Sequence, residues 1–219
     1  MADHALLIEF ATEVSYGANQ LVVALDRAIS AESIPGVKEV VPGMVSLLVD
    51  FDPLRVDHER VEAAVRERLT EAEPQLDEGR VHTVHVCYDA AFGSDLSVVA
   101  ELASLSEEAV IAAHLAGEYR VFMYGFAPGY AYLAGVPERI QVPRKAVPVR
   151  GVPAGSVIIA GPQCLVTTLE MPTGWSIIGR SPTRILLEDP VRPFRFDVGD
   201  RVRFERIDAA AFDRLVEVE

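Results

Sequence analysis

Apolar residues in the first 90 positions alternate in some segments and recur at helical spacing in others. The alternation predicts strands at residues 5–10, 37–41, 44–51 and 81–88, and the helical spacing predicts helices at residues 17–29 and 57–69. The order strand, helix, strand, strand, helix, strand is that of the split βαβ, or ferredoxin-like, arrangement. We therefore predict a small α/β domain over residues 1–85.

The remainder of the chain begins with two predicted helices, at residues 95–102 and 106–116. Ser106 is a suitable N-cap for the second of them, and Gly117 ends it. Short β-rich runs separated by glycine and proline follow at residues 119–124, 156–160, 164–169, 175–180, 184–187 and 201–206, before a last helix at 208–216. Such a series is typical of a barrel or a sandwich. We predict a second domain over residues 86–219, which makes the fold class α+β.

The composition is that of a soluble globular protein with an acidic surface. Half of the 219 residues are apolar, and the formal net charge is −13. This acidic excess excludes nonspecific nucleic-acid binding, which requires a basic surface, and disfavours docking on anionic membranes. No apolar run approaches the roughly 20 residues that span a bilayer, and Met1 to His4 does not start a secretory signal. We expect a cytoplasmic protein with no nucleic-acid or membrane partner.

The charge is unevenly distributed along the chain. Residues 1–80 carry 16 acidic and 7 basic groups, whereas residues 120–184 carry seven basic groups and only Glu138 and Glu170 as acids. A positive segment in an acidic protein favours an anionic ligand or partner. The alternative is that these basic groups pair with acidic groups elsewhere in the fold.

Residues 119–132 hold six of the sixteen aromatic side chains of the chain. At the centre of this stretch is Gly125-Phe126-Ala127-Pro128-Gly129-Tyr130, in which two glycines and a proline favour an irregular backbone. Such a backbone beside aromatic rings suits the wall of a small-molecule pocket. The alternative is ordinary aromatic packing under a tight turn.

Two further stretches bring basic groups together with proline or tryptophan. Residues 143–156 contain Arg144, Lys145 and Arg150 between recurring prolines, which predicts a stiff, extended loop with little helix or strand pairing. Guanidinium groups on a stiff loop favour capture of a carboxylate, carbamate or phosphate. The other stretch contains Trp175 and, where a strand ends, Arg180. The alternative for residues 143–156 is a solvated surface loop, and the alternative for the other stretch is a tryptophan packed in the core.

Several catalytic templates are absent from the sequence. There is no Walker-type phosphate loop, no GxGxxG and no GxSxG, and no cluster with metal-ligand spacing, so we expect no metal. His114 lies late in a predicted helix and is either a packed residue or a base. Cys87 and Cys164 are interpreted as two buried thiols rather than as a disulfide or a nucleophile.

Taken together and in order, several segments resemble those of one family. They are Asp95-Leu96, Ser106 to Ile111 with His114, Tyr119-Arg120-Val121, Gly125 to Leu133, Val152 to Val157, Ile159-Ala160-Gly161, Gly174-Trp175 and Ile178-Gly179-Arg180. Over residues 5–206 the chain resembles the allophanate hydrolase subunit 1 family. That family includes the B subunit of the bacterial ATP-dependent 5-oxoprolinase, the carboxyltransferase part of urea carboxylase, and Kip-type inhibitors of a sporulation histidine kinase.

The resemblance implies a cyclophilin-like β-barrel for the second domain. It also implies a partner, the family's subunit 2, with which the chain would form a site for carboxyl transfer or amide hydrolysis. The implied substrates are small ureido, lactam or carbamoyl compounds. ATP chemistry belongs to the assembled complex, in keeping with the missing nucleotide loop here.

The resemblance further assigns residues to the site. Those carried over by matching position are Phe126, Pro128, Gly129, Arg144, Gln163, Trp175 and Arg180. Tyr130 and Arg150 are added as substrate-binding residues, and Arg144 is placed with His114 and Tyr124 among the catalytic ones. The sequence departs from the family's usual strings at Val149, Thr167, Thr168 and Thr173.

Two functions follow from these observations. The first is an enzyme subunit, in which the positive segment holds a substrate carboxylate, oriented donors stabilise the oxyanion, and His114 or Tyr124 transfers protons. The second is a regulatory module that binds and inhibits a protein kinase. We prefer the enzyme subunit and expect the isolated chain to be inactive.

Overall fold

The computed structural model describes residues 3–71 and 79–217. The chain divides into two compact units, residues 1–77 and 78–219. Within the described residues, no helix is both long and apolar enough to cross a membrane.

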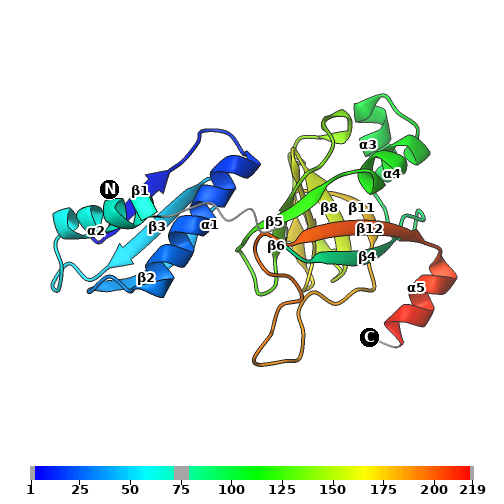
Figure 1. Ribbon diagram of the computed structural model, residues 1–219. Coiled ribbons are helices and arrows are strands. Elements are labelled where there is room, and N and C mark those ends of the chain that lie inside the picture. Colours follow the sequence, from blue (N-terminus) through cyan, green and yellow to red (C-terminus); the bar gives the residue numbers. More distant parts are fainter. Residues whose placement is uncertain (1–2, 72–78, 218–219) are drawn as a thin grey trace. The chain divides into compact units, whose positions relative to one another are not determined.

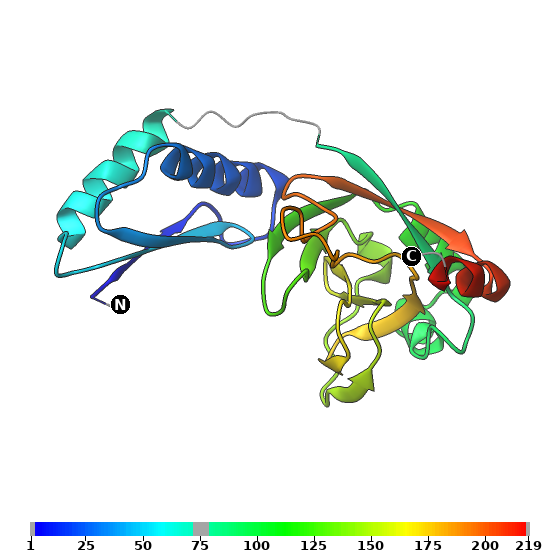
Figure 2. The same ribbon diagram turned by 90° about the horizontal axis from the view of Figure 1, so that it is seen from below.

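The N-terminal unit is a three-stranded sheet with two helices. Its elements are β1 (Ala5–Glu9), α1 (Tyr16–Ala31), β2 (Val37–Pro42), β3 (Ser46–Phe51) and α2 (His58–Glu71). The strands are antiparallel in the order β1-β3-β2, and both helices cover one face of the sheet (Figure 2). Leu47, Val49 and Phe51 alternate along β3 and are fully buried against the helices. Every one of these elements was predicted within a few residues.

The predicted fourth strand of this sheet lies elsewhere. Strand β4 (Val81–Cys87) pairs in parallel with β12 (Arg201–Ile207) along its whole length, and therefore belongs to the second unit. The predicted boundary between residues 85 and 86 falls inside β4. The physical reason is that alternation shows only that a strand has a buried face: Val84 and Val86 bury theirs in the barrel core.

The second unit is built on a closed barrel (Figure 1). Its strands follow the order β11-β4-β12-β5-β6-β9-β8, and β8 pairs back to β11. Besides β4 and β12, they are β5 (Tyr119–Tyr124), β6 (Ala131–Ala134), β8 (Ser156–Ala160), β9 (Gln163–Val166) and β11 (Ser176–Arg180). The helices of this unit are α3 (Leu96–Ala103), α4 (Glu107–Leu115), the short η1 (Glu138–Ile140) and α5 (Ala209–Val216). The predicted barrel is thus confirmed.

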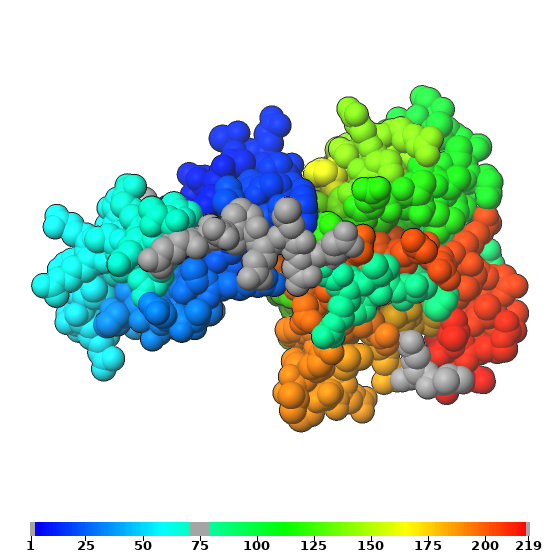
Figure 3. Space-filling model, viewed as in Figure 1, coloured from blue at the N-terminus to red at the C-terminus, as the bar shows by residue number. Residues whose placement is uncertain are grey.

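Two segments differ from their predictions. Residues 149–152 of the proline-rich stretch form β7 (Val149–Val152), which pairs with β10 (Met171–Thr173), because the prolines flank these four residues and leave their backbone groups free to pair. Residues 184–187 form no named strand, and only Leu186 makes an isolated bridge, to Phe194. The segment after them, orange in Figure 3, protrudes from the surface of the unit.

Candidate functional site

Residues on the outer surface of three barrel strands form a second, smaller core, here called the outer cluster. Its buried members are Tyr130, Val152, Ile158, Ala160, Leu165, Trp175 and Ile177, with Ala127, Tyr132 and Met171 packed against them. The neighbouring residues Val157, Ile159, Cys164, Val166 and Ile178 point into the barrel instead. Strand alternation therefore gives each strand one row in the barrel core and one in the outer cluster.

Trp175 joins this cluster to a positive charge. Its side chain is only 6% exposed, and its indole ring meets the ring of Tyr132 edge-on at 5.9 Å between centroids. The guanidinium carbon of Arg144 lies 5.5 Å from the Trp175 ring centroid. A cation at that distance from an indole is attracted by the ring electrons, by about 0.5–1 kcal/mol at an exposed site. We call Arg144, Trp175, Tyr132, Tyr130 and Phe126 the aromatic–arginine site.

A tight turn brings Phe126 and Tyr130 to this site. Phe126 has a φ of 69°, in the left-handed region that non-glycine residues rarely adopt, and its side chain is 76% exposed. Its ring lies 5.6 Å from that of Tyr130. Burial raises the pKa of Tyr130 to about 12. The Tyr130 phenol therefore stays protonated at neutral pH and can act as a hydrogen-bond donor.

Threonine hydroxyls hold the loops around the site. Thr168 Oγ1 donates to the Pro128 carbonyl at 2.7 Å, and Thr173 Oγ1 accepts from the Trp175 N–H at 3.1 Å. Thr167 Oγ1 donates to the Pro153 carbonyl at 2.8 Å. The hydroxyls of Thr168 and Thr173 thus bond to the backbone of the Pro128 turn and of the residue before β11.

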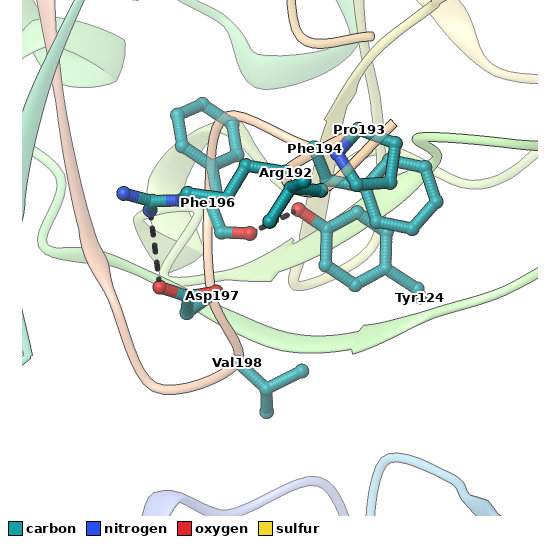
Figure 4. A pocket seen from close by; sticks show the side chains of 8 residues that line it. Tyr124, Arg192, Pro193, Phe194, Phe196, Asp197 and Val198 are labelled. Carbon is teal, nitrogen blue, oxygen red and sulfur yellow. Dashed lines mark hydrogen bonds and ion pairs between the residues drawn. The ribbon is translucent and has the colours of Figure 1, made fainter. Parts of the chain in front are cut away.

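Tyr124 pairs with Ala131 on the neighbouring strand, but its side chain packs against the barrel core and lines a pocket of about 300 Å³ (Figure 4). Its hydroxyl donates to the Phe196 carbonyl at 2.8 Å, and its ring stacks on Phe194 at 4.8 Å. Burial raises the pKa of Tyr124 well above its ordinary value. Across the pocket, Arg192 pairs with Asp197 at 3.3 Å. Tyr124 is thus a neutral phenol engaged with the backbone, which is the environment of a structural group rather than of a proton donor to substrate.

His114 lies in the barrel core and has no exposed surface. The Tyr88 hydroxyl contacts Nδ1 at 2.8 Å and Cys164 Sγ contacts Nε2 at 3.5 Å, so both ring nitrogens have a partner. Burial lowers the pKa of His114 to about 3. The structure therefore gives His114 the packed role that was the alternative to catalysis, because no atom of the ring can reach a substrate. Cys87 and Cys164 are both buried free thiols, as predicted.

The other predicted site residues are dispersed over the barrel unit. Gln163 begins β9 and is paired there with Ala134 and Ala160. Arg180 donates through Nε to the Ala154 carbonyl at 3.1 Å, and its guanidinium lies 5.8 Å from the Phe212 ring centroid.

The remaining predicted site residues are Arg150, Pro128 and Gly129. Arg150 is exposed on β7. Pro128 and Gly129 shape the Phe126 turn, where Gly129 has a φ of 73°. The structure thus brings together Arg144, Trp175, Phe126 and Tyr130, but neither His114 nor Tyr124.

Both interpretations of the positive segment hold in part. Lys145 pairs with Asp95, and Arg184 pairs with Glu188 at 3.6 Å. Arg144 instead lies over an aromatic ring and is exposed, so it can meet an anion from solution. Sequence reasoning missed Asp95 as part of this region because its partner lies 50 residues away in the chain.

The chain matches the family described as carboxyltransferase domain, subdomains C and D, over residues 1–194. Because that match covers most of its length, the chain belongs to this family, and the predicted resemblance is confirmed.

Two relatives are both named as the B subunit of 5-oxoprolinase. The chain is 38% identical over 218 residues to the 5-oxoprolinase B subunit of Bacillus subtilis (strain 168), covering 94% of this chain and 91% of that protein. It is 36% identical over 207 residues to the 5-oxoprolinase B subunit of Escherichia coli O157:H7, covering 93% of each. Among solved structures, that of TTHA0988 superposes with a TM-score of 0.79 at 35% identity. That superposition covers 94% of this chain but only 40% of the other, so this chain spans less than half of that protein.

Proposed function

We propose that the chain is subunit 1 of a two-subunit enzyme of the 5-oxoprolinase or allophanate hydrolase type. The observation that carries the proposal is Arg144, exposed and held over Trp175 at 5.5 Å, in a chain whose relatives are named as B subunits of 5-oxoprolinase. The proposed substrates are small lactam, ureido or carbamoyl compounds, and the proposed partner is the family's subunit 2.

The chemistry of the aromatic–arginine site suits such substrates. A guanidinium group binds a carboxylate through two parallel N–H donors, which fixes the plane of the substrate as well as its charge. The partly exposed ring of Tyr132 can pack against a flat lactam or ureido group.

The chain's own residues account for binding and orientation. Placing the reacting carbonyl beside fixed donors lowers the barrier by positioning and by stabilising the developing oxyanion. His114 is buried, and the Tyr124 hydroxyl is bonded to the Phe196 carbonyl, so neither side chain is available for proton transfer to a substrate. The other subunit would therefore supply the general acid and the general base. ATP would likewise be used by the assembled complex, so we expect the isolated chain to be inactive.

The test is co-expression with a subunit 2 homologue, followed by size-exclusion chromatography and ATP-dependent turnover of 5-oxoproline, urea and allophanate. Arg144→Ala removes a charged hydrogen-bond donor worth about 3 kcal/mol and should lower kcat/KM about 100-fold. Arg139→Ala is the matched control, because Arg139 is an exposed arginine on η1 and its removal changes the net charge equally.

Three outcomes separate the possibilities. Coelution with turnover that Arg144→Ala lowers to the expected extent and Arg139→Ala preserves would support the proposal. Coelution and turnover with equal effects of both variants would remove Arg144 from the site. Absence of coelution would contradict the proposed partner and favour the kinase-binding alternative, which stays a prediction.

A further inference from the structure

Asp95 stands at the N-cap of α3 but makes no side-chain capping bond there. An aspartate in that position ordinarily accepts the N–H of one of the next three residues. Its carboxylate oxygen Oδ2 instead accepts the Ile177 N–H at 2.7 Å and the ammonium of Lys145 at 2.5 Å. The Asp95 N–H also donates to the Ile177 carbonyl at 2.9 Å. A single carboxylate thus joins α3, β11 and the loop that contains Lys145.

Both bridged segments lead directly to the aromatic–arginine site. Lys145 is the next residue after Arg144, and its backbone N–H donates to the carbonyl of Gly174, the residue before Trp175, at 2.7 Å. Ile177 follows Trp175 by two residues and lies with it in the outer cluster. The Asp95 carboxylate therefore fixes the chain on both sides of the contact between Arg144 and Trp175.

The ion pair is protected from water. The Asp95 side chain is 18% exposed and that of Lys145 is 20% exposed, whereas Arg144 beside them is exposed. A largely buried pair holds one geometry, because separating it would leave two charges poorly solvated. Without the ion pair, the backbone bond from Lys145 to Gly174 would still hold the main chain, but the exposed Arg144 side chain beside it would sample more rotamers and lose its fixed place over the indole.

We propose that Asp95 and Lys145 are positioning residues that hold Arg144 over Trp175. This inference rests on the proposed function for its catalytic meaning, but the placement itself is testable in the isolated chain. Neither residue touches the substrate in this proposal; each acts through the Arg144 guanidinium.

Trp175 is the single tryptophan of the chain, so its fluorescence reports the site directly. A guanidinium over the indole attracts the anionic quencher iodide and repels caesium. We expect the iodide-to-caesium ratio of quenching constants to fall about twofold in Arg144→Ala at an ionic strength of about 0.1 M. Acrylamide, a neutral quencher, measures exposure alone.

Asp95→Asn is the decisive variant. It removes a negative charge, so a simple change in local charge would raise the iodide-to-caesium ratio. If Arg144 loses its place, the ratio falls as it does in Arg144→Ala. In the Arg144→Ala background, Asp95→Asn should then produce no further fall. Glu108→Gln is the matched control, since Glu108 pairs with Arg206 at 2.7 Å between α4 and β12.

A ratio that stays constant or rises in folded Asp95→Asn would overturn the proposal. Circular dichroism establishes whether the variant is folded, and Lys145→Met, which breaks the same pair from the other side, serves if it is not. A fall of the ratio in Lys145→Met counts only if it is absent in the Arg144→Ala background, because that variant also removes a positive charge.

The assembled enzyme gives a second measurement. Asp95→Asn should raise the KM about tenfold with a smaller change in kcat, as expected when a binding group is misplaced. A fall of the quenching ratio without any turnover in the complex would support the positioning role and contradict the proposed function. An unchanged quenching ratio in an active complex would contradict the positioning role and support the proposed function.

Discussion

Alternate residues of the same barrel strands lie in two contrasting environments. On β8, Val157 and Ile159 face the barrel core, whereas Ile158 and Ala160 face the outer cluster. Both rows are apolar and both are buried. The difference lies in the polar groups of the two clusters: Cys164 of the barrel core contacts His114, and Trp175 of the outer cluster lies under Arg144.

The polar groups of the barrel core are bonded to one another. Tyr88 and Cys164 contact the two ring nitrogens of His114, and the Tyr119 hydroxyl donates to the His114 carbonyl at 3.0 Å. Burial lowers the pKa of His114 and raises that of Cys164, so both remain neutral. In the outer cluster, by contrast, Arg144 keeps its charge in contact with solvent. The comparison teaches that the titratable groups around His114 are bonded to one another, whereas the outer cluster carries an exposed charge at Arg144.

The largest expected effect concerns the charge state of the barrel core. Because the folded pKa of His114 is about 3 and its ordinary value is 6.5, the unfolded chain binds a proton that the folded chain does not. The stability that a neutral His114 contributes is therefore present above pH 6.5 and lost as the pH falls toward 3. Wild type should lose about 3 kcal/mol by pH 4, and about 4 kcal/mol by pH 3, relative to His114→Gln.

The measurement is urea unfolding of both chains at several pH values. All other titrating groups are shared, so the difference between the two curves isolates His114. A difference that does not change with pH would mean that the ring accepts a proton in the folded state, and the contrast between core and outer cluster would be lost.

The next effect compares neighbouring isoleucines on one strand. Ile159→Ala leaves a cavity in the closed barrel and should lower the free energy of unfolding by about 4 kcal/mol. Ile158→Ala should cost about 2 kcal/mol, because the loops over the outer cluster can settle into the space. Only Ile158→Ala should shift the emission of Trp175. Equal costs together with equal spectra would contradict the separation of the two cores.

The smallest expected effect is at Phe126. Phe126→Gly relieves a left-handed backbone that costs about 1 kcal/mol or more, but it also increases the freedom of the unfolded chain by a similar amount. The free energy of unfolding should therefore change by less than about 1 kcal/mol. Binding to the aromatic–arginine site should weaken, because the ring is 76% exposed beside Tyr130. Thermal melting and substrate KM measure the two effects separately.

The sequence pattern predicted most elements but not all of their partners. The helix cap at Ser106 is a local feature, and the structure confirms it through the hydrogen bond that the Ala109 N–H donates to Ser106 Oγ. Strand β4 was located correctly but placed in the N-terminal sheet. Its alternation records one buried face, and nothing in those residues specifies that β12, far away in the chain, covers its edge.

The candidate site was predicted in part for the same reason. Arg144, Trp175, Phe126 and Tyr130 were named from their segments and from the family resemblance, and they lie together. His114 and Tyr124 were named from residue type and position in the sequence, which carry no information on how deeply each side chain is buried. Asp95 was missed as a partner of Lys145 because only the folded barrel brings those segments into contact.

The pairing of β12 with β4 also sets an order of events during synthesis. Arg201 pairs with Val81 and Ile207 with Cys87, so the barrel cannot close until its last strand has left the ribosome. The N-terminal sheet completes its pairing within residues 5–51. A growing chain therefore carries one finished unit followed by an open strand edge, which is the type of surface that chaperones shield from aggregation.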